Sequence, residues 1–418
     1  MKKELVILAG SCYPISSATG SIAIKIGKVL SDEYNVRIIA VEQDGNHYDG
    51  KEIDGFKVYS ITNWRLKWAQ KSKNNRDNSQ GLVSSLYQTS FYLARLFGRF
   101  QATFLYLNNN KWYIEKAFRK LLEINGQKKI DVILTCAAPH EAHMVGEKFK
   151  KTFPDIRWVT YWGDLLASKI NKLNIFTSME KMKTIETNLC NACDYILTTE
   201  ENYQVLLAEV LNKEKIKALP YTLNQDVIDR YNDPVIGKPE LTTLVYMGAF
   251  YRDIRNPKYF LRLMMKLKCD YQLLLYSSGN CEDIIDSYVG QSNGRIIKKK
   301  QIPKSELVEV LRKADFLINV ENSIANTNPS KLLELISYGK PIIDFSFADT
   351  ITATLKEFPL SLNINMNNDI NFNEKLVEGF IHDNRLKQLK LDIILDRYSM
   401  HLDSNVNRLL FDVFGGQS

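Results

Sequence analysis

Short, continuous apolar runs alternate with amphipathic stretches along the first half of the chain. Leu5–Ala9 is the first such run, and Ile22, Ile26 and Leu30 then recur at helical spacing. The segments VRIIAV, FKVYSI, DVILTCA, RWVTYW and DYILTT repeat the strand pattern, several of them before a helical window such as HEAHMVGEKFKK. Continuous apolar strands separated by helices indicate a parallel sheet that helices cover on both faces.

The alternation lapses between residues 220 and 241, where PYTLNQDVIDRYNDPVIGKPEL has no sustained period. It restarts with LTTLVYMG and continues through the strand candidates YQLLLYS, DFLINV and PIIDF. We therefore predict an α/β protein of two Rossmann-like, doubly wound domains, with residues 1–220 in the first and 221–395 in the second. Any ligand is expected at the carboxyl ends of the strands, between the two domains.

Length and composition agree with this division. At 418 residues the chain exceeds the size of one ordinary core, and 45% hydrophobic with 25% charged residues is typical of a globular protein. No window reaches the length of an apolar membrane span, and the N-terminus has no signal-peptide pattern, so we expect a cytoplasmic protein. The six cysteines are expected to be reduced core thiols, because Cys190-x-x-Cys193 has no second pair to complete a zinc site.

The net charge of +7 is unevenly distributed. Residues 57–130 hold 14 Lys and Arg against 3 Asp and Glu, and they are rich in aromatic residues, as in LYQTSFYLARLFGRF. This basic aromatic segment allows three interpretations: a solvated face, a nucleic-acid surface or a membrane-interface patch. No nucleic-acid module accompanies it, and bulky apolar residues between basic ones favour a peripheral position on an anionic membrane.

Two loops carry candidate chemistry. GSCYPISSATGS, from Gly10 to Ser21, follows the first strand and places hydroxyl residues and Gly20 at a helix start. Backbone amides there suit a phosphate, and an ordinary N-capped turn explains the loop equally well. NPSKLLELISYGKPII, from Asn328 to Ile343, predicts a helix with Gly339 at its C-cap. Its Lys331 and Glu334 are read either as a surface ion pair or as groups that face a ligand.

The second loop resembles the P-S-K-x-x-E-x-x-x-x-G-K-P segment of retaining glycosyltransferases of family 4, which have the GT-B fold of two Rossmann-like domains facing across a cleft. VYMGAFYRDIRNPKYFLRLM, DVILTCAAPHEAHMVGEKFKK, RWVTYWGDL and CDYILTTEENYQVLL resemble further family segments in the correct order and at the correct spacing. The resemblance covers nearly the whole chain. It also implies that a C-terminal helix, within residues 396–418, packs back toward the N-terminal domain.

The resemblance assigns roles to single residues. Glu334 matches the second glutamate of the family's E-x7-E pair, which holds the nucleotide ribose, and Asn326 stands where the family has the first glutamate. Arg255 and Lys331 are expected beside the leaving diphosphate and His140 near the donor sugar, which makes these three the candidate catalytic residues. The remaining expected donor-binding residues are Gly20, Gly248, Arg252 and Ser330. Asp164 and His143 are expected on the acceptor side.

The predicted function is transfer of a sugar, with retention of configuration, from a nucleotide diphosphate to a glycan acceptor. We expect a UDP-sugar donor, and a lipid-linked acceptor of cell-surface polysaccharide biosynthesis would explain the basic aromatic segment. The chain has no Asp-x-Asp, so we expect no metal and no cofactor. A nucleotide-sugar epimerase of the same fold and a non-catalytic sugar-binding protein are the alternatives.

Overall fold

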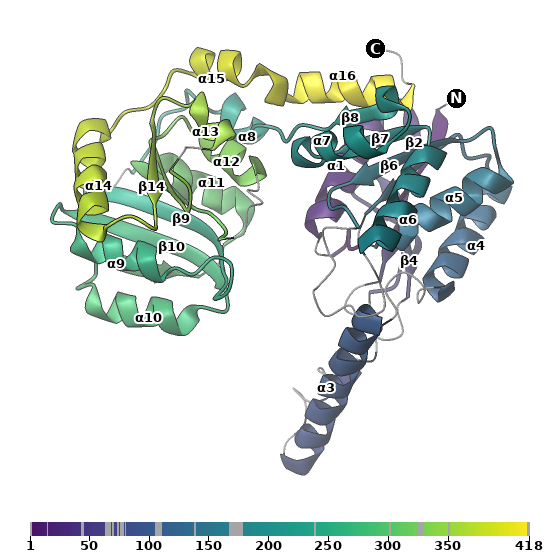
Figure 1. The fold of residues 1–418 in the computed structure, drawn as a ribbon, viewed down its shortest axis with the longest axis horizontal. Helices are drawn as coiled ribbons and strands as arrows, with labels where there is room; N and C mark the ends of the chain where they lie inside the picture. The colour runs from purple at the N-terminus through teal and green to yellow at the C-terminus, as the bar shows by residue number, and fades with distance from the viewer. Residues whose placement is uncertain are drawn as a thin grey trace. The chain divides into compact units, whose positions relative to one another are not determined.

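The structure is a computed structural model, and it describes most of the chain. The described residues are 2–14, 16–42, 46–62, 68, 71–72, 75, 79, 81–104, 111–137, 139–166, 179–237, 240–300, 302–323, 329–349 and 352–415. For residues 82, 94–104, 304–305 and 329–330 it describes the backbone alone. The chain folds into two compact units: unit 1 comprises 1–220 with 407–418, and unit 2 comprises 221–406 (Figure 1).

Unit 1 is built on a sheet in which the described strands follow the order β3-β4-β2-β1-β5-β6-β7-β8. Its strands are β1 (Lys3–Leu8), β2 (Tyr34–Val41), β3 (Asp49–Ile53), β4 (Phe56–Ile61), β5 (Val132–Cys136), β6 (Arg157–Trp162), β7 (Tyr195–Thr198) and β8 (Ile216–Ala218). All neighbouring pairs are parallel except β3 and β4. The order reverses between β1 and β5, so the carboxyl ends of these two strands mark the switch point of the sheet.

Helices cover both faces of the unit 1 sheet. They are α1 (Ala18–Leu30), α4 (Lys111–Gln127), α5 (Glu141–Thr152), α6 (Met179–Ala192) and α7 (Glu200–Glu209). Helix α3 (Gly81–Phe104) extends away from the sheet (Figure 1), and α16 (Asp403–Phe414), most of which belongs to unit 1, ends at the amino ends of the strands. Val6 and Leu8 of β1 face the core shared with α4 and α5. On the opposite face Gly27 of α1 lies beside Ile7 and Phe56, since an added Cβ there would be 3.3 Å from both side chains.

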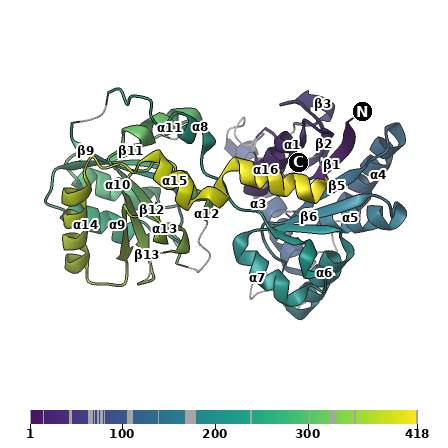
Figure 2. The ribbon, with the colours of Figure 1, turned by 90° about the horizontal axis from the view of Figure 1, so that it is seen from above.

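The C-terminal helix α16 ends against unit 1 (Figure 2). Three donors reach its last carbonyl groups: the Tyr34 hydroxyl donates to Phe414 O at 2.6 Å, Arg157 to Val413 O at 3.3 Å and Lys3 to Gly415 O at 3.2 Å. A helix leaves its final carbonyls without intrahelical partners and carries partial negative charge there. Two cations and a hydroxyl of unit 1 therefore cap α16.

Unit 2 is built on a second sheet, whose described strands are all parallel and follow the order β11-β10-β9-β12-β13-β14. The strands are β9 (Thr242–Phe250), β10 (Tyr271–Gly279), β11 (Ile296–Lys299), β12 (Phe316–Val320), β13 (Ile342–Ser346) and β14 (Ser361–Asn365). The helices are α8 (Gln225–Asp229), α9 (Lys258–Lys266), α10 (Glu282–Gln291), α11 (Lys304–Lys313), α12 (Pro329–Ile336), α13 (Ala353–Lys356), α14 (Ile370–Asn384) and α15 (Leu391–Arg397).

Helices lie on both faces of the unit 2 sheet (Figure 1), and an apolar layer lies between them and each face. One contains Ile318 and Ile343 with α9, α10 and α14, and the other contains Leu317 and Ile342 with α11, α12 and α13. Alternate residues of each strand thus serve opposite layers, as the continuous apolar runs predict. Gly339 ends the last turn after α12 at φ +64°, the left-handed conformation that glycine adopts without strain.

Close packing of α5 on β6 depends on a glycine. An added Cβ at Gly146 would lie 2.4 Å from Nε1 of the buried Trp158, whereas one at Gly126 of α4 would meet no atom within 4 Å. We expect Gly146→Ala to destabilise the protein by about 2 kcal/mol through overpacking. The matched Gly126→Ala should be neutral or stabilise by about 0.5 kcal/mol. Urea unfolding measures both, and equal midpoints for the two variants would contradict this account of the α5 packing.

Candidate functional site

The site expected in unit 2 lies where the strand order reverses. β9 runs between β10 and β12, and the chain passes outward to β11 before it returns to β12. Parallel strands present all their carboxyl ends at one edge, and a crevice forms where neighbouring connections leave in opposite directions. The loop after β9, the residues after β12 and the N-terminus of α12 meet at that edge.

A pocket of about 430 Å³ opens at this edge and is lined by Met247, Gly248, Tyr276, Ile302, Leu307, Lys331 and Glu334. The lining residues are of two kinds, apolar and charged. Tyr276, Ile302 and Leu307 supply an aromatic ring and two aliphatic side chains, whereas Lys331 and Glu334 supply charge. Such a pocket accommodates a ligand that has a flat apolar part, hydroxyl groups and an anionic part.

Gly248 brings the end of β9 close to Lys331. Its φ of +145° is a conformation that residues with side chains rarely adopt. A Cβ at this position would also lie 3.0 Å from Lys331 Nζ and 3.1 Å from the Tyr246 hydroxyl. The backbone can therefore approach a ligand directly beside the lysine only because residue 248 is glycine.

Lys331 is the third residue of α12, and its amino group is buried. Among the described residues Nζ has no hydrogen-bond partner, although it lies 4.4 Å from the centroid of the Tyr246 ring. Burial, reinforced by the charge of Arg255, lowers the pKa of Lys331 to about 7, while Asp344 and Glu334 act in the opposite direction. The interpretation as a surface ion pair does not describe this buried amine.

Arg255 folds back over the end of β9. A backbone bridge holds its loop, with Tyr251 N donating to Arg255 O at 3.0 Å and Arg255 N donating to Tyr251 O at 2.9 Å. The guanidinium donates to Ala249 O at 3.4 Å, and its buried Nε has no partner among the described residues. Arg255 and Lys331 thus place two cations at one strand end, each with hydrogen-bonding capacity left over.

Two carboxyl groups that the sequence analysis did not select lie beside these cations. Asp344 is fully buried in β13 and accepts a hydrogen bond from Asn319 Nδ2 at 2.7 Å. Burial raises the pKa of Asp344 to about 6, against the lowering effects of Asn319 and Lys331. Glu321 follows β12, and burial together with the charge of Asp344 raises its pKa to about 8. The sequence signal for Asp344 was a charged residue inside the apolar run PIIDF.

The other expected donor-binding residues of unit 2 lie differently. Arg252 forms an ion pair with Asp283 at 2.5 Å, with about half of its side chain exposed. Ser330 belongs to the first turn of α12, where the structure describes the backbone alone. Asn326 lies outside the described residues. The structure therefore brings together Gly248, Lys331 and Glu334 around one pocket, with Arg255 beside Lys331.

In unit 1, His140 is the N-cap residue of α5 and His143 lies in its first turn, at the carboxyl side of β5. His140 Nε2 donates to the backbone carbonyl of Asp164 at 3.2 Å, so Asp164 contributes its main chain here and its side chain is exposed. His143 is fully buried, stacks on Trp162 with ring centroids 4.1 Å apart and forms a 2.8 Å hydrogen bond with Thr135. Burial lowers the pKa of His143 well below its usual value, so this ring is neutral at physiological pH.

Gly20 lies in the first turn of α1, at the other side of the same switch point. Its amide donates to the Ser17 side chain at 3.1 Å, which makes Ser17 the N-cap of α1. An added Cβ on Gly20 would lie 2.0 Å from the Ser11 carbonyl oxygen. Gly20 therefore lets the helix start pack against the loop after β1.

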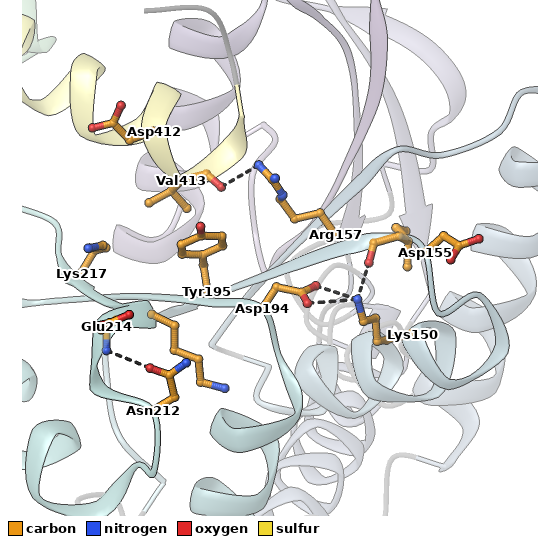
Figure 3. A pocket seen from close by; sticks show the side chains of 12 residues that line it. Lys150, Asp155, Arg157, Asp194, Tyr195, Asn212, Glu214, Lys217, Asp412 and Val413 are labelled. Carbon is orange, nitrogen blue, oxygen red and sulfur yellow. Dashed lines mark hydrogen bonds and ion pairs between the residues drawn. The ribbon is translucent and has the colours of Figure 1, made fainter.

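A second pocket, of about 800 Å³, lies at the opposite edge of the unit 1 sheet (Figure 3). Arg157 and Tyr195 begin β6 and β7, so this pocket opens at the amino ends of the strands. Three of its cations already have partners: Lys150 donates to Asp194 at 2.8 Å, Arg157 to Val413 O and Lys215 to Cys193 O. Because ligand crevices of such sheets lie at the carboxyl ends, the smaller pocket in unit 2 is the better candidate.

Two properties were searched for in the part of the chain that the structure describes. There, no three His, Cys, Asp or Glu side chains gather as they would around a metal ion. Within the same residues, no helix combines the length and the apolarity needed to cross a bilayer.

No family model and no curated protein matches the sequence of this chain. Solved structures do match its fold. A sucrose-phosphate synthase from Thermosynechococcus elongatus aligns with a TM-score of 0.63 at 13% identity, over 99% of this chain and 98% of that one. The lipopolysaccharide outer core galactosyltransferase WaaB aligns with a TM-score of 0.60 at 12% identity, over 99% of both chains.

The HepE protein of Anabaena, in a structure that contains UDP, aligns with a TM-score of 0.59 at 11% identity, over 99% of this chain and 100% of that one. These likenesses and the two parallel-dominated sheets confirm the predicted fold class. The chain has the GT-B fold of two Rossmann-like domains.

Proposed function

We propose that this protein is a glycosyltransferase that moves a sugar from a nucleoside diphosphate donor to a hydroxyl of a glycan acceptor. The observation that carries the proposal is the pocket of unit 2, whose lining combines Lys331, Glu334 and Gly248 with Tyr276, Ile302 and Leu307. A nucleotide has the matching parts: a flat base, ribose hydroxyls and a diphosphate. The UDP in the HepE structure supports a UDP-sugar as the donor.

In this proposal the base lies against the ring of Tyr276 and the two aliphatic side chains. Glu334 accepts hydrogen bonds from the ribose hydroxyls, because a carboxylate is the acceptor that two neighbouring hydroxyls satisfy best. Gly248 lets the diphosphate approach the backbone at the end of β9. Lys331 and Arg255 then lie where negative charge grows as the bond between the sugar and the phosphate breaks.

The resemblance to family 4 leads us to propose retention of configuration and a reaction that needs no metal ion or other cofactor. Two protein cations supply the charge compensation that a divalent ion provides in other transferases. His140 is proposed to contact the donor sugar, and Asp164 and His143 to shape the acceptor side of unit 1. The neutral, fully buried His143 suits a role in holding Trp162 and the end of β5 in place.

We further propose that the acceptor is lipid-linked, as in cell-surface polysaccharide assembly, and that the basic aromatic segment docks on an anionic membrane surface. Helix α3 supports this idea because its described part exposes Leu86 (70%), Tyr92 (58%) and Leu93 (52%). Arg95 and Arg99 follow on the same helix, and Arg119 is exposed on α4. Apolar side chains beside cations are the composition of an interfacial helix.

The first test concerns the nucleotide. Replacing Glu334 with Ala should raise the UDP dissociation constant at least about tenfold, a loss of about 1.4 kcal/mol. Isothermal titration calorimetry with the folded variant measures this change. Glu357→Ala, an exposed carboxylate elsewhere in unit 2, is the matched control and should leave UDP binding unchanged. An unaltered UDP affinity in the Glu334 variant would remove Glu334 from the ribose site.

The second test separates binding from catalysis. Arg255→Met and Lys331→Met should each lower kcat at least about tenfold, by more than they raise the donor dissociation constant, because charge on the leaving diphosphate is greatest in the transition state. Steady-state kinetics and donor titrations of each variant give the two quantities. A loss confined to donor affinity would make these residues simple binding groups.

The same assay in excess chelator should show undiminished product. Loss of activity in chelator, with rescue by added magnesium, would contradict metal independence.

The third test concerns the membrane. Reversing Arg95, Arg99 and Arg119 to Glu should lower binding to phosphatidylserine vesicles at least about tenfold, since each basic residue near anionic headgroups contributes about 1 kcal/mol. Lys120 is left out of the reversed set because it already forms ion pairs with Asp49 and Glu123. Reversal of Lys356, Lys375 and Lys390, which are exposed in unit 2, is the control for total charge. Equal vesicle sedimentation of both triple variants would eliminate the membrane-docking proposal.

A further inference from the structure

The carboxyl edge of the unit 2 sheet concentrates charged groups that are only partly satisfied by one another. Four buried atoms there have no hydrogen-bond partner among the described residues: Lys331 Nζ, Arg255 Nε, Glu321 Oε1 and Asp344 Oδ2. They come from α12, the loop after β9, the end of β12 and β13. Isolated buried polar atoms are uncommon, and four in one cluster indicate that the cluster is built for a further partner.

The two carboxyl groups belong to this cluster by geometry. Asn319 and Asp344 are register partners in the parallel pair β12 and β13, so their side chains lie next to each other on the face that carries α12. Asn319 donates to one oxygen of Asp344 and leaves the other oxygen unpartnered. Glu321 follows Asn319 by two residues and so continues the same face beyond the strand end. The carboxylates therefore face the groups that the proposed function assigns to the diphosphate.

We propose that Glu321 and Asp344 act as resident counter-anions of Arg255 and Lys331, and that the diphosphate displaces them in an exchange that takes up protons. The inference rests on the proposed function in one respect, since it takes the ligand to be a diphosphate. In the empty site the carboxyl groups act on the two cations through their charge and not through a direct ion pair. Near pH 7, Asp344 is largely ionised, Lys331 is about half protonated and Glu321 is largely protonated. When the diphosphate binds, its oxygens satisfy Lys331 and Arg255, and the carboxyl groups, now beside additional negative charge, bind protons.

The charged and titratable neighbours of the cluster agree with this exchange. Tyr246 of β9 contributes the ring beneath Lys331, and Glu334 of α12 contributes a further negative charge at the pocket side. The charges of Arg255 and Asp344 each shift the pKa values of Lys331 and Glu321, and the charge of Lys331 shifts the pKa of Asp344. Two cations and three carboxyl groups thus share one edge, so an arriving dianion must change the proton count of the site.

The direction of the linkage follows from three pKa values. Lys331 has its pKa lowered to about 7, Glu321 has its pKa raised to about 8 and Asp344 has its pKa raised to about 6. A bound diphosphate adds negative charge and therefore raises all three pKa values. Protons are taken up wherever a group is partly deprotonated in the free protein, chiefly between pH 7 and 9. Diphosphate affinity should consequently fall as the pH rises through that range.

The experiment is calorimetric titration of the full-length protein with UDP and, separately, with inorganic pyrophosphate between pH 7.0 and 9.0. Measuring in HEPES and in Tris, whose ionisation enthalpies differ, gives the number of protons taken up. UDP keeps its terminal phosphate largely ionised above pH 7, since the second pKa of such a phosphate is about 6. Inorganic pyrophosphate still loses its last proton toward the upper end of this range, so its proton numbers are corrected for the ionisation of the free ligand. We expect uptake of about half a proton or more near pH 8 and a dissociation constant that rises at least about fivefold from pH 7.0 to 9.0.

Two isosteric variants assign the protons. Glu321→Gln should bind both ligands at least about fivefold more tightly than the unmodified protein at pH 8.5 and should take up fewer protons, because the competing negative charge is gone. Asp344→Asn keeps an acceptor for Asn319 and should act in the same direction. Glu374→Gln is the matched control: this buried carboxylate of α14 pairs with Lys266 in the opposite layer and should leave the pH profile unchanged.

The outcomes distinguish this inference from the proposed function. UDP binding with no proton uptake and a flat pH profile would overturn the inference and leave the nucleotide proposal standing. Pyrophosphate binding with proton uptake, in a protein that binds no nucleotide, would support the counter-anion exchange and reject the nucleotide. Weaker binding by both Glu321→Gln and Asp344→Asn, with the proton number unchanged, would make these carboxyl groups direct ligand contacts and refute the exchange. If neither ligand binds, both proposals fail.

Discussion

Burial of the parallel strands on both faces is the constraint on which the rest of this structure depends. Within β9, β12 and β13 a side chain must satisfy one of two apolar layers, so charge is costly along most of each strand. It is tolerated where a polar partner is present, as for Asp315 before β12 and Asp344 within β13, and at the carboxyl edge, where the sheet order reverses and the connections diverge. Arg255, Glu321, Lys331 and Asp344 all occur at that edge. Their concentration in one place is therefore a consequence of the architecture as well as a sign of function.

The same constraint explains which elements could be predicted from the sequence. Strands such as DVILTCA and DFLINV are visible because burial on both faces requires nearly unbroken apolar runs. β3 was missed because it is an antiparallel edge strand whose residues are exposed or only half-buried, so DGKEI has no apolar run. β14 and β11 mix polar and apolar positions for a similar reason, since each lies at an edge of the unit 2 sheet. The apolar pattern of a segment reflects how deeply that segment is buried. Edge strands are less buried, so their pattern is weaker.

For the site, the sequence identified residues at strand ends and helix starts, but it did not show which residues they contact in the fold. Lys331 and Glu334 were identified from one segment, and Gly248 with Arg255 from another. That Lys331 lies against Gly248 and above Tyr246 depends on how α12 docks on β9, about 85 residues away along the chain, which no local pattern encodes. Asn319 and Asp344 become neighbours only through the register of β12 and β13. The stacking of His143 on Trp162 is hidden for the same reason.

The carboxyl pair also changes what the two cations accomplish. Under the proposed function, a buried lysine and arginine without counter-ions would hold the diphosphate tightly, and the nucleoside diphosphate product would leave slowly. Resident carboxylates compete for the same cations and so weaken ground-state binding of substrate and product alike. Charge that develops only during bond cleavage is still stabilised, because it appears after the exchange has occurred. Under the proposed function and exchange, a site that keeps Glu321 and Asp344 beside Arg255 and Lys331 gives up affinity for the diphosphate while it retains stabilisation of the leaving group.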